Sequence, residues 1–257
     1  MKFHDQTEMG GNRGAFLTTH WSLIEDVKAC PDKNGALIGL LLQTYWKPVY
    51  CYLRRKGRDN EQAKDLTQDF FHEVVLNRHL VGRADKDKGR FRSFMLYALN
   101  QYLINHDRDD RAKKRIPKKK LAPLDTAELP DLPQSFSTAT AEDSYHYAWL
   151  SALLERVTAE VKTACQEQGM ETHWAIFKEH VLEPILGVGD PVSLTQLCEI
   201  YGIEDTKKAS NMIVTVKRRF RSVLMEHVRS TVVSDEQVHE ELQYLLQFLP
   251  ENAQRPE

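Results

Sequence analysis

The segment KDLTQDFF, Lys64–Phe71, places two carboxylates, Asp65 and Asp69, four residues apart in the chain. Residues at this spacing are neighbours on one face of an α-helix. Paired carboxylates can perform general acid–base chemistry, but this needs a pocket that perturbs their pKa values, and the sequence shows no sign of one. Two interpretations stay open: an ordinary solvated helix face, or a docking face for a basic partner surface.

On a helical wheel the two acids belong to a compact polar face, whose members lie within about 60° of its centre line. Its members are Glu61, Asp65, Gln68, Asp69 and His72. The opposite face is apolar and consists of Ala63, Leu66, Phe70, Phe71, Val74 and Val75. We expect the apolar face to pack against a preceding helix through residues such as Val49, Tyr52 and Leu53, which leaves the acidic face exposed.

A second segment, residues 89–115, interleaves basic and aromatic residues within one helical pattern. Cations can follow the phosphates of a single strand while aromatic rings stack on its bases. We expect the outer face to carry Arg90, Arg92, Asn100, Asn105 and Arg108. The full set of predicted nucleic-acid contacts is Arg90, Phe91, Arg92, Asn100, Tyr102, Asn105 and Arg108. We expect Phe94, Leu96, Leu99, Leu103 and Ile104 to belong to the core.

The acidic cluster Asp107–Asp110 could suggest a metal site, but arginines flank it and no His or Cys partners stand at ligand spacing. No arrangement of nucleophile and base is evident elsewhere. We therefore expect a protein that is not an enzyme and that holds neither a metal nor a cofactor.

A third segment, Ser193–Arg221, has the pattern of a helix–turn–helix. Leu194, Leu197, Cys198 and Tyr201 share one face of a short helix, Gly202 supplies a turn, and Asp205 or Thr206 caps a longer helix. The apolar face of the longer helix is Ala209, Met212, Ile213, Val216, Phe220 and Leu224. Its outer face is Lys207, Lys208, Asn211, Val214, Thr215, Arg218 and Arg219. Mere helix packing is the alternative, but an outer face without acids favours DNA.

The elements that must position these residues are helices. Strand signals are scarce and helical spacing is common, so the sequence predicts an all-α fold. Four prolines (positions 117, 123, 130 and 133) keep one stretch extended. We expect two helical domains, residues 14–115 and 142–233, joined by an acidic, Pro-rich linker over residues 116–141 and followed by a C-terminal helical extension over residues 234–257.

The net charge of −2 over 257 residues conceals strong local asymmetry. Lys86–Lys120 has a balance of +8 and Leu121–Asp143 one of −5. Lys207–Arg221 has +6, and Ser234–Glu257 returns to −5. Two basic blocks separated by an acidic one favour two contacts with a polyanion.

Four scattered cysteines, no apolar run near ~18 residues and no hydrophobic leader predict a reduced, cytoplasmic protein without membrane insertion. In the extension, Ser234 and Gln237 fit a capping box. An apolar stripe follows, made of Val238, Leu242, Leu245, Leu246 and Leu249. This helix either docks on the preceding domain or acts as a regulatory arm that masks a nucleic-acid face.

Together these segments resemble a bacterial RNA polymerase sigma factor of the extracytoplasmic-function (ECF) type, from a subgroup with an acidic linker and a C-terminal extension. The resemblance covers nearly the whole chain from FLTTHWSLI onward. It rests on YWKPVYCYLRRKG with EQAKDLTQDFFHEVV, on KGRFRSFMLYALNQYLINHDRDDRAKKR, and on SLTQLCEIYGI with VKRRFRSVLMEHV. Lys64 departs from the pattern, which usually has an acid there.

The resemblance implies that residues 14–115 form sigma domain two and residues 142–233 form sigma domain four. The face with Asp65, Gln68, Asp69 and His72 would bind the clamp helices of the polymerase's largest subunit. Domain four would contact the flap of the second-largest subunit. The segment Gly89–Arg108 would hold the melted −10 element of promoter DNA, and Lys207–Arg221 would bind the −35 element. The linker would thread through polymerase channels.

An anti-sigma factor or another regulatory protein is a further candidate partner, and the polymerase itself would perform the chemistry. The alternative function is a helix–turn–helix transcriptional regulator that binds DNA without polymerase. The acidic face distinguishes the two, because a plain repressor has no use for Asp65, Gln68 and Asp69.

Overall fold

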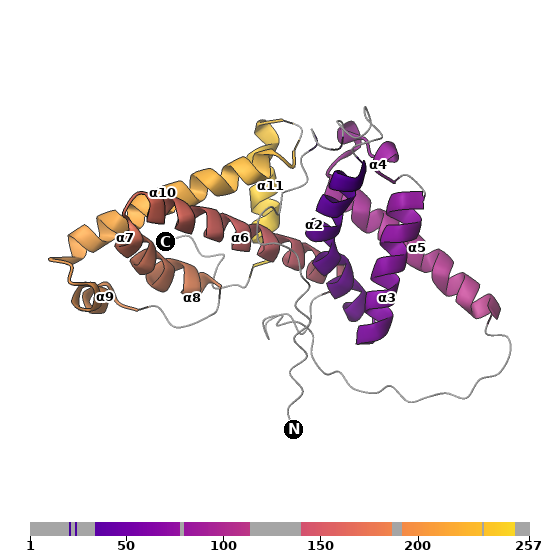
Figure 1. Cartoon of the computed structure of the whole chain (residues 1–257), viewed down its shortest axis with the longest axis horizontal. Helices are drawn as coiled ribbons and strands as arrows, with labels where there is room; N and C mark the ends of the chain where they lie inside the picture. Colours follow the sequence, from indigo (N-terminus) through magenta and orange to yellow (C-terminus); the bar gives the residue numbers. More distant parts are fainter. Residues whose placement is uncertain are drawn as a thin grey trace, which may run out of the picture.

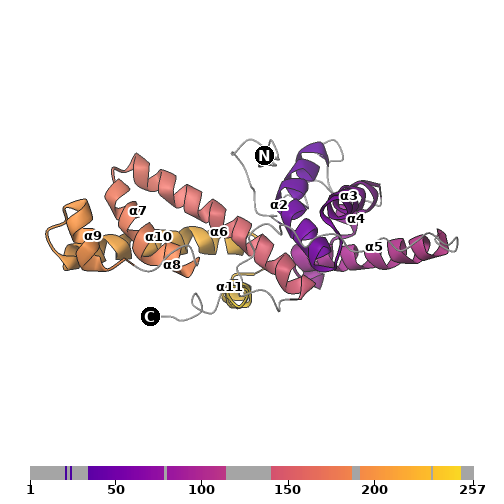
Figure 2. The ribbon, with the colours of Figure 1, turned by 90° about the horizontal axis from the view of Figure 1, so that it is seen from below.

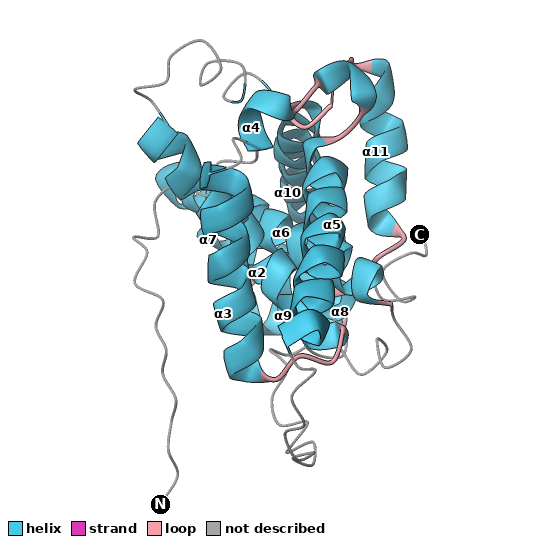
Figure 3. Ribbon diagram, turned by 90° about the vertical axis from the view of Figure 1, so that its right-hand side faces the viewer, coloured by secondary structure: helices cyan, strands magenta, loops and turns pink. Residues whose placement is uncertain are grey.

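The computed structural model describes residues 21, 24, 34–77, 80–113, 140–186, 192–232 and 234–249. Within these ranges every regular element is a helix and no strand occurs (Figure 3). The all-α prediction is therefore confirmed for the part of the chain that the structure describes. Most of the predicted linker, residues 114–139, lies outside the described residues.

The first group of helices occupies residues 34–113 and contains the predicted acidic and aromatic–basic segments. Its elements are α2 (Asn34–Arg55), α3 (Asn60–Phe70), the π-helix η2 (Phe71–Asn77), α4 (Leu80–Arg83), the 3₁₀-helix η3 (Lys86–Lys88) and α5 (Phe91–Lys113). The apolar face of α3 packs on α2, with Phe70 of α3 and Val49 and Tyr52 of α2 all fully buried (Figure 1). The helical wheel of α3 is confirmed by this burial.

A capping box starts α3. The Asp59 carboxylate accepts a hydrogen bond from the Gln62 main-chain N–H at 2.8 Å, and the Gln62 side chain reaches back to the Asp59 N–H at 3.4 Å. The chain arrives from α2 through a turn at Gly57, whose φ of 86° suits glycine. The start of α3, and with it the register of its acidic face, is thus determined locally.

The second group occupies residues 141–246. Its elements are α6 (Ala141–Glu167), α7 (Glu171–Phe177), the π-helix η5 (Lys178–Leu182), α8 (Glu183–Ile185), α9 (Leu194–Tyr201), α10 (Thr206–Arg229) and α11 (Glu236–Leu246). α10 packs against α6, α7, α9 and α11. α11 follows a tight turn after α10 and lies between the two groups (Figure 1).

The long helix α6 connects the two groups (Figure 2). One part of it packs on α2, and another packs on α7 and α10. At the α2 contact, the Tyr52 hydroxyl oxygen lies 3.2 Å from the Glu142 carboxylate, and Glu142 also pairs with Lys56 at 3.4 Å. Buried apolar side chains from both groups form one cluster. The division into two domains therefore stays a prediction, since α6 belongs to the second by sequence and packs on the first.

The predicted capping box at Ser234 and Gln237 is wrong. α11 begins at Glu236, and its N-cap residue Asp235 makes no side-chain capping bond. The Gln237 main-chain N–H donates to the Ser234 carbonyl at 3.2 Å, while the Ser234 side chain bonds to Glu236 and lowers the pKa of that carboxyl. The apolar stripe itself is confirmed, with Val238, Leu245 and Leu249 buried.

Candidate functional site

The acidic face of α3 is exposed as predicted. Asp65, Gln68, Asp69 and His72 all present exposed side chains, while Leu66 on the opposite side is buried. On the side opposite the acidic face, Phe71 stacks on Trp46 of α2 with ring centroids 6.2 Å apart. A rigid, solvent-facing row of acid and amide groups is a surface that a basic partner can contact without rearranging α3.

Lys64 lies beside this face and pairs with another acid. Its ammonium group contacts the Glu61 carboxylate at 3.4 Å, one helical turn away. The two side chains are 36% and 79% exposed, so this pair contributes little to stability. Its effect is instead to reduce the negative charge at the N-terminal end of the face.

The residues predicted on α5 divide into three groups by exposure. Asn105 and Arg108 are exposed, Arg90 and Asn100 are half-buried, and Phe91, Arg92 and Tyr102 are buried. The placement of Arg92 on the outer face is therefore wrong. So is the placement of Ile104 in the core, since Ile104 is 62% exposed.

Tertiary neighbours explain the buried positions. Phe91 packs edge-on against Trp21 and Tyr45, and Tyr102 packs against Phe70 of α3. The Asn100 side chain accepts a hydrogen bond from the Tyr52 hydroxyl of α2. The amide of Asn100 is thus engaged inside the protein in this conformation.

Tyr97 is not among the predicted site residues, yet it is the most accessible aromatic residue of α5, with 62% of its surface exposed. It lies two turns before Ile104, so the two share one side of the helix. The exposed side of α5 therefore offers Tyr97, Ile104, Asn105 and Arg108 to a ligand. Alternation of basic and aromatic residues was the signal for such a surface, but the members that face solvent differ in part from those expected.

The start of α5 carries a buried polar cluster that periodicity did not reveal. Both Arg90 and Arg92 form ion pairs with Glu241 of α11, whose carboxylate is fully buried. The Arg92 guanidinium lies 5.1 Å from the ring centroids of both Trp149 and Tyr244, and that of Arg90 lies 4.9 Å from Tyr244. We call these residues, Arg90, Arg92, Trp149, Tyr244 and Glu241, the arginine cluster.

The cluster joins three helices that are distant in sequence: α5, α6 and α11. From α6, the Tyr145 hydroxyl donates a hydrogen bond to the Arg92 carbonyl at 3.1 Å. The sequence contains one sign of this arrangement. Val238, Glu241, Leu242 and Leu245 follow i, i+3, i+4, i+7 spacing, so an acid occupies a position within an apolar stripe.

His146 of α6 borders the cluster. Its Nε2 lies 3.3 Å from the Tyr244 hydroxyl, and its ring lies 4.8 Å from that of Phe248. Burial lowers the pKa of His146 to about 4, and the positive charge of Arg92 adds to this effect. His146 is therefore neutral at neutral pH, and the charge in this region comes from the arginines and Glu241.

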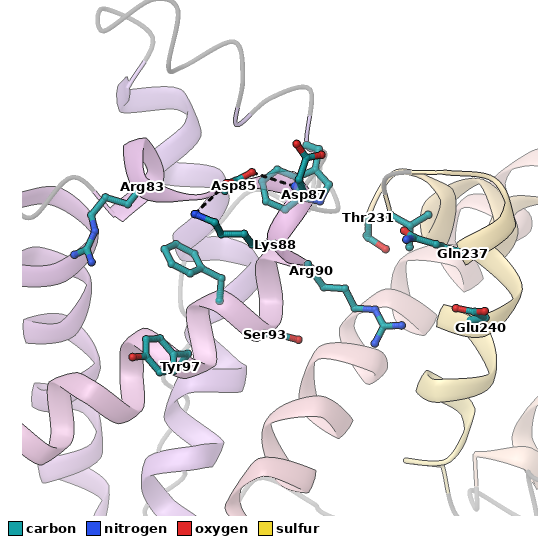
Figure 4. Close-up of a pocket in the computed structure, with 14 residues that line it drawn as sticks. Arg83, Asp85, Asp87, Lys88, Arg90, Ser93, Tyr97, Thr231, Gln237 and Glu240 are labelled. Atoms are coloured by element: carbon teal, nitrogen blue, oxygen red, sulfur yellow. Dashed lines mark hydrogen bonds and ion pairs between the residues drawn. The ribbon is translucent and has the colours of Figure 1, made fainter.

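A cavity of about 780 Å³ opens beside the cluster (Figure 4). One wall comes from the loop and first turns around α5, including Lys88, Ser93 and Tyr97. The other comes from the α10–α11 turn and the start of α11, including Gln237 and Glu240. The cavity shows that the first turn of α11 is not closely packed on α5, so a small number of side chains hold these helices together.

A short helix, a glycine turn and a longer helix follow one another at the predicted positions. Gly202 ends α9 with a φ of 63°, and the Ile203 N–H donates to the Cys198 carbonyl at 2.9 Å. Of the two proposed caps for α10, Asp205 is the one used, and its carboxylate accepts from the Lys208 N–H at 2.6 Å. A capping box of Ser193 and Gln196, not anticipated from the sequence, starts α9.

The two faces of α10 also follow the prediction, with one exception. The inner face is buried or half-buried throughout. The outer face exposes Lys207, Lys208, Asn211, Val214, Thr215 and Arg218. Arg219 departs from it: this residue is half-buried and donates to the Gln168 side chain at 2.5 Å, so it links α10 to the end of α6.

No group of three or more His, Cys, Asp or Glu residues that could hold a metal occurs among the described residues. No helix in the described ranges combines the length and apolar character needed to cross a bilayer. Cys51, Cys165 and Cys198 are free thiols, and burial raises the pKa of Cys51 to about 11.

A scan of the chain against protein-family models found no match, and searches of curated proteins and of solved structures found none either. Function is therefore inferred from the side-chain geometry above and from the sequence pattern.

Proposed function

We propose that this protein is an RNA polymerase sigma factor, which binds core polymerase and directs it to promoters through the −10 and −35 elements. One observation carries the proposal: the chain exposes two polar surfaces of opposite charge on different helices. Asp65, Gln68 and Asp69 of α3 form the acidic surface, and α10 forms the basic one. A protein that bridges a basic protein surface and DNA needs both, and the polymerase supplies the catalysis.

The acidic surface of α3 is the proposed contact with the clamp helices of the largest subunit. Complementary charge accelerates encounter and determines the register of docking. The exposed His72 extends the surface by a further turn. An acidic face has no role in a regulator that only binds DNA, because its charge repels the phosphates.

The basic surface of α10 is the proposed reader of the −35 element. In a helix–turn–helix, the second helix inserts its N-terminal part into the major groove. Asn211 has the chemistry to read adenine, Arg218 to bind guanine or phosphate, and Val214 to contact a thymine methyl group. Lys207 and Lys208 lie in the first turn, where cations and main-chain N–H groups suit phosphate.

The exposed side of α5, with Tyr97, Asn105 and Arg108, is the proposed first contact with the melted −10 strand. Stacking on an aromatic ring contributes roughly 1–3 kcal/mol per base. Arg90 and Arg92, also expected to bind this strand, are engaged by Glu241 in the present conformation. Their participation requires a rearrangement at the start of α5.

The deciding experiment is co-purification of the full chain with core polymerase. We expect the double variant Asp65→Lys/Asp69→Lys to lose this association, because reversing two charges turns an attractive contact into a repulsive one. Binding to promoter duplex should persist, since α10 is unchanged. The matched control is Glu167→Lys/Glu171→Lys, which reverses two exposed acids near the α6–α7 turn and should leave co-purification intact.

Unchanged co-purification of the α3 double variant would remove the support for that surface. Promoter-specific binding without any association between the wild-type chain and polymerase would favour the polymerase-independent regulator instead.

A further inference from the structure

We infer that α11 is an intramolecular latch: Glu241 and Tyr244 occupy the place of a nucleotide on Arg90 and Arg92, so nucleic acid must displace α11 to reach the start of α5. This inference deepens the proposed function and rests on α5 being a nucleic-acid surface. The sequence leaves two interpretations open for this helix: docking on the preceding domain, or masking a nucleic-acid face. α11 does pack on α10, and the arginine cluster adds a second contact, with the start of α5.

The first line of support is the chemistry that α11 offers to the arginines. The two oxygens of Glu241 are divided between them: Oε1 faces Arg92 and Oε2 faces Arg90. Carboxylate and phosphate groups are the anions that guanidinium groups bind best, through the same paired geometry. Tyr244, one turn further along α11, adds an aromatic ring within about 5 Å of both guanidinium groups. An anion next to an aromatic ring is also what a nucleotide presents.

The second line of support is that the contact is incompletely satisfied. Within the described part of the chain, Nε and Nη2 of Arg92 are buried without a hydrogen-bond partner. A buried donor without a partner costs about 1–3 kcal/mol. The Glu241 carboxylate is shared between two arginines, and a phosphate has more acceptor oxygens to direct at Arg92. A phosphate can therefore satisfy these donors once α11 leaves.

The third line of support is energetic. Removing two charges from water costs nearly as much as their attraction returns, so a buried ion pair is a weak source of net stability. The adjacent cavity of about 780 Å³ shows that little apolar packing supports the first turn of α11 on α5. Figure 4 shows Arg90 extended across this opening toward α11. Such a contact is specific, and a competing polyanion can replace Glu241 on the two arginines.

The closed arrangement has a direct consequence for α5. While α11 is in place, Arg92 is almost entirely inaccessible. The Arg90 side chain is 32% exposed, and the later turns, with Tyr97, Asn105 and Arg108, are open to a ligand. The latch therefore leaves a partial nucleic-acid surface exposed and withholds Arg92 together with part of Arg90.

The test measures the affinity of the full chain for a fluorescein-labelled single-stranded oligodeoxynucleotide of random sequence, by fluorescence anisotropy at fixed salt. Glu241→Gln removes the anion, and Tyr244→Leu removes the ring without leaving a charge unpaired. Each variant should bind at least about tenfold more tightly, because less free energy is then needed to move α11 away from Arg90 and Arg92. Glu167→Gln makes the same charge change at an exposed position of α6 away from the cluster, and its affinity should stay within about twofold of wild type.

Hydrogen exchange supplies the second measurement. Adding the oligonucleotide to the wild-type chain should accelerate amide exchange in Glu236–Leu246 and slow it at the start of α5. Tyr244→Leu remains informative if Glu241→Gln fails to fold, which a thermal melt by circular dichroism will show. Unchanged affinity in a folded Tyr244→Leu protein, or no change in α11 exchange when the oligonucleotide binds, would overturn the latch.

Failure of the latch and failure of the proposed function are distinguishable. If the variants gain affinity for the oligonucleotide but the wild-type chain does not associate with core polymerase, the latch stands and the sigma assignment falls. If polymerase association depends on Asp65 and Asp69 while α11 variants bind the oligonucleotide like wild type, the assignment stands and the latch falls.

Discussion

Arg92 of α5 and Glu241 of α11 form an ion pair in which their side chains are only 2% and 0% exposed, although 149 positions separate them in the chain. The pair places the C-terminal helix against the segment proposed to bind the melted promoter strand. One contact thus connects the stability of the fold to the access of its proposed ligand.

The first prediction concerns the contribution of the Arg92–Glu241 ion pair to the free energy of unfolding. Glu241→Leu alone should lower the free energy of unfolding, because Arg92 loses its partner; the loss should stay below the ~3–5 kcal/mol of a charge that remains buried, since α11 can move away and expose Arg92. The double variant Arg92→Met/Glu241→Leu should recover most of that loss or exceed wild type. Urea denaturation of the four members of the double-mutant cycle measures the difference. A double variant as unstable as the single one would contradict this account.

The second prediction concerns pH. The pKa of His146 is about 4 in the folded chain against 6.5 for a free histidine, so the unfolded chain binds the proton first as pH falls. Stability should therefore decline between pH 6.5 and 4, by on the order of 3 kcal/mol from this residue. The charges of Arg92 and Arg90 add to the lowering of the His146 pKa, whereas those of Asp143 and Glu142 oppose it.

The control for that titration is His146→Phe, which keeps an aromatic ring and removes the proton site. The difference in unfolding free energy between the two proteins, measured at intervals from pH 7.5 to 4, isolates the histidine. Parallel curves for the two proteins would show that another group causes the decline.

The third prediction concerns the turn between α9 and α10. Gly202 has a φ of 63°, and a Cβ added there meets open space, so Gly202→Ala tests backbone strain alone. We expect a loss of roughly 1–2 kcal/mol in stability, together with weaker binding of duplex DNA. Gly82→Ala is the matched control, since Gly82 lies in the helix α4 with equally open space and needs no positive φ. Thermal unfolding of both variants measures the difference in stability between them.

The fourth prediction concerns salt dependence on the basic face of α10. Removing one phosphate contact with Lys207→Ala or Lys208→Ala should reduce the slope of log K against log salt by about 0.9. Asn211→Ala should instead reduce discrimination between promoter sequences while leaving the slope unchanged. Arg219→Ala serves as a control that should leave the slope unchanged, because the Arg219 side chain bonds to Gln168. Anisotropy titrations with duplex DNA at several salt concentrations give all four slopes.

The fifth prediction concerns Lys64. Its pairing with Glu61 reduces the negative charge beside Asp65, so Lys64→Glu should increase affinity for core polymerase several-fold. Lys162→Glu makes the same charge change at an exposed position on α6 and should have no comparable effect. Surface-binding kinetics with purified core enzyme can show whether the gain appears in the association rate, as electrostatic steering requires. Equal gains in both variants would point to net charge as the cause.

The amino-acid sequence by itself determined the local architecture of the proposed surfaces. The acidic face of α3, the two faces of α10 and the turn at Gly202 all follow from helical periodicity, capping residues and glycine chemistry. These depend on neighbours within a few positions along the chain, which sequence reasoning can evaluate.

Only the tertiary structure decided what covers α5. Periodicity placed Arg92 outside and Ile104 inside, and both placements were wrong, because the environment of a helix face depends on which distant element packs there. Contacts from Trp21, Tyr145 and Glu241 bury the start of α5, whereas nothing in the described ranges covers Ile104. A charged residue can occupy an interior position when its counter-charge arrives from another helix, and that pairing is established only when the chain folds.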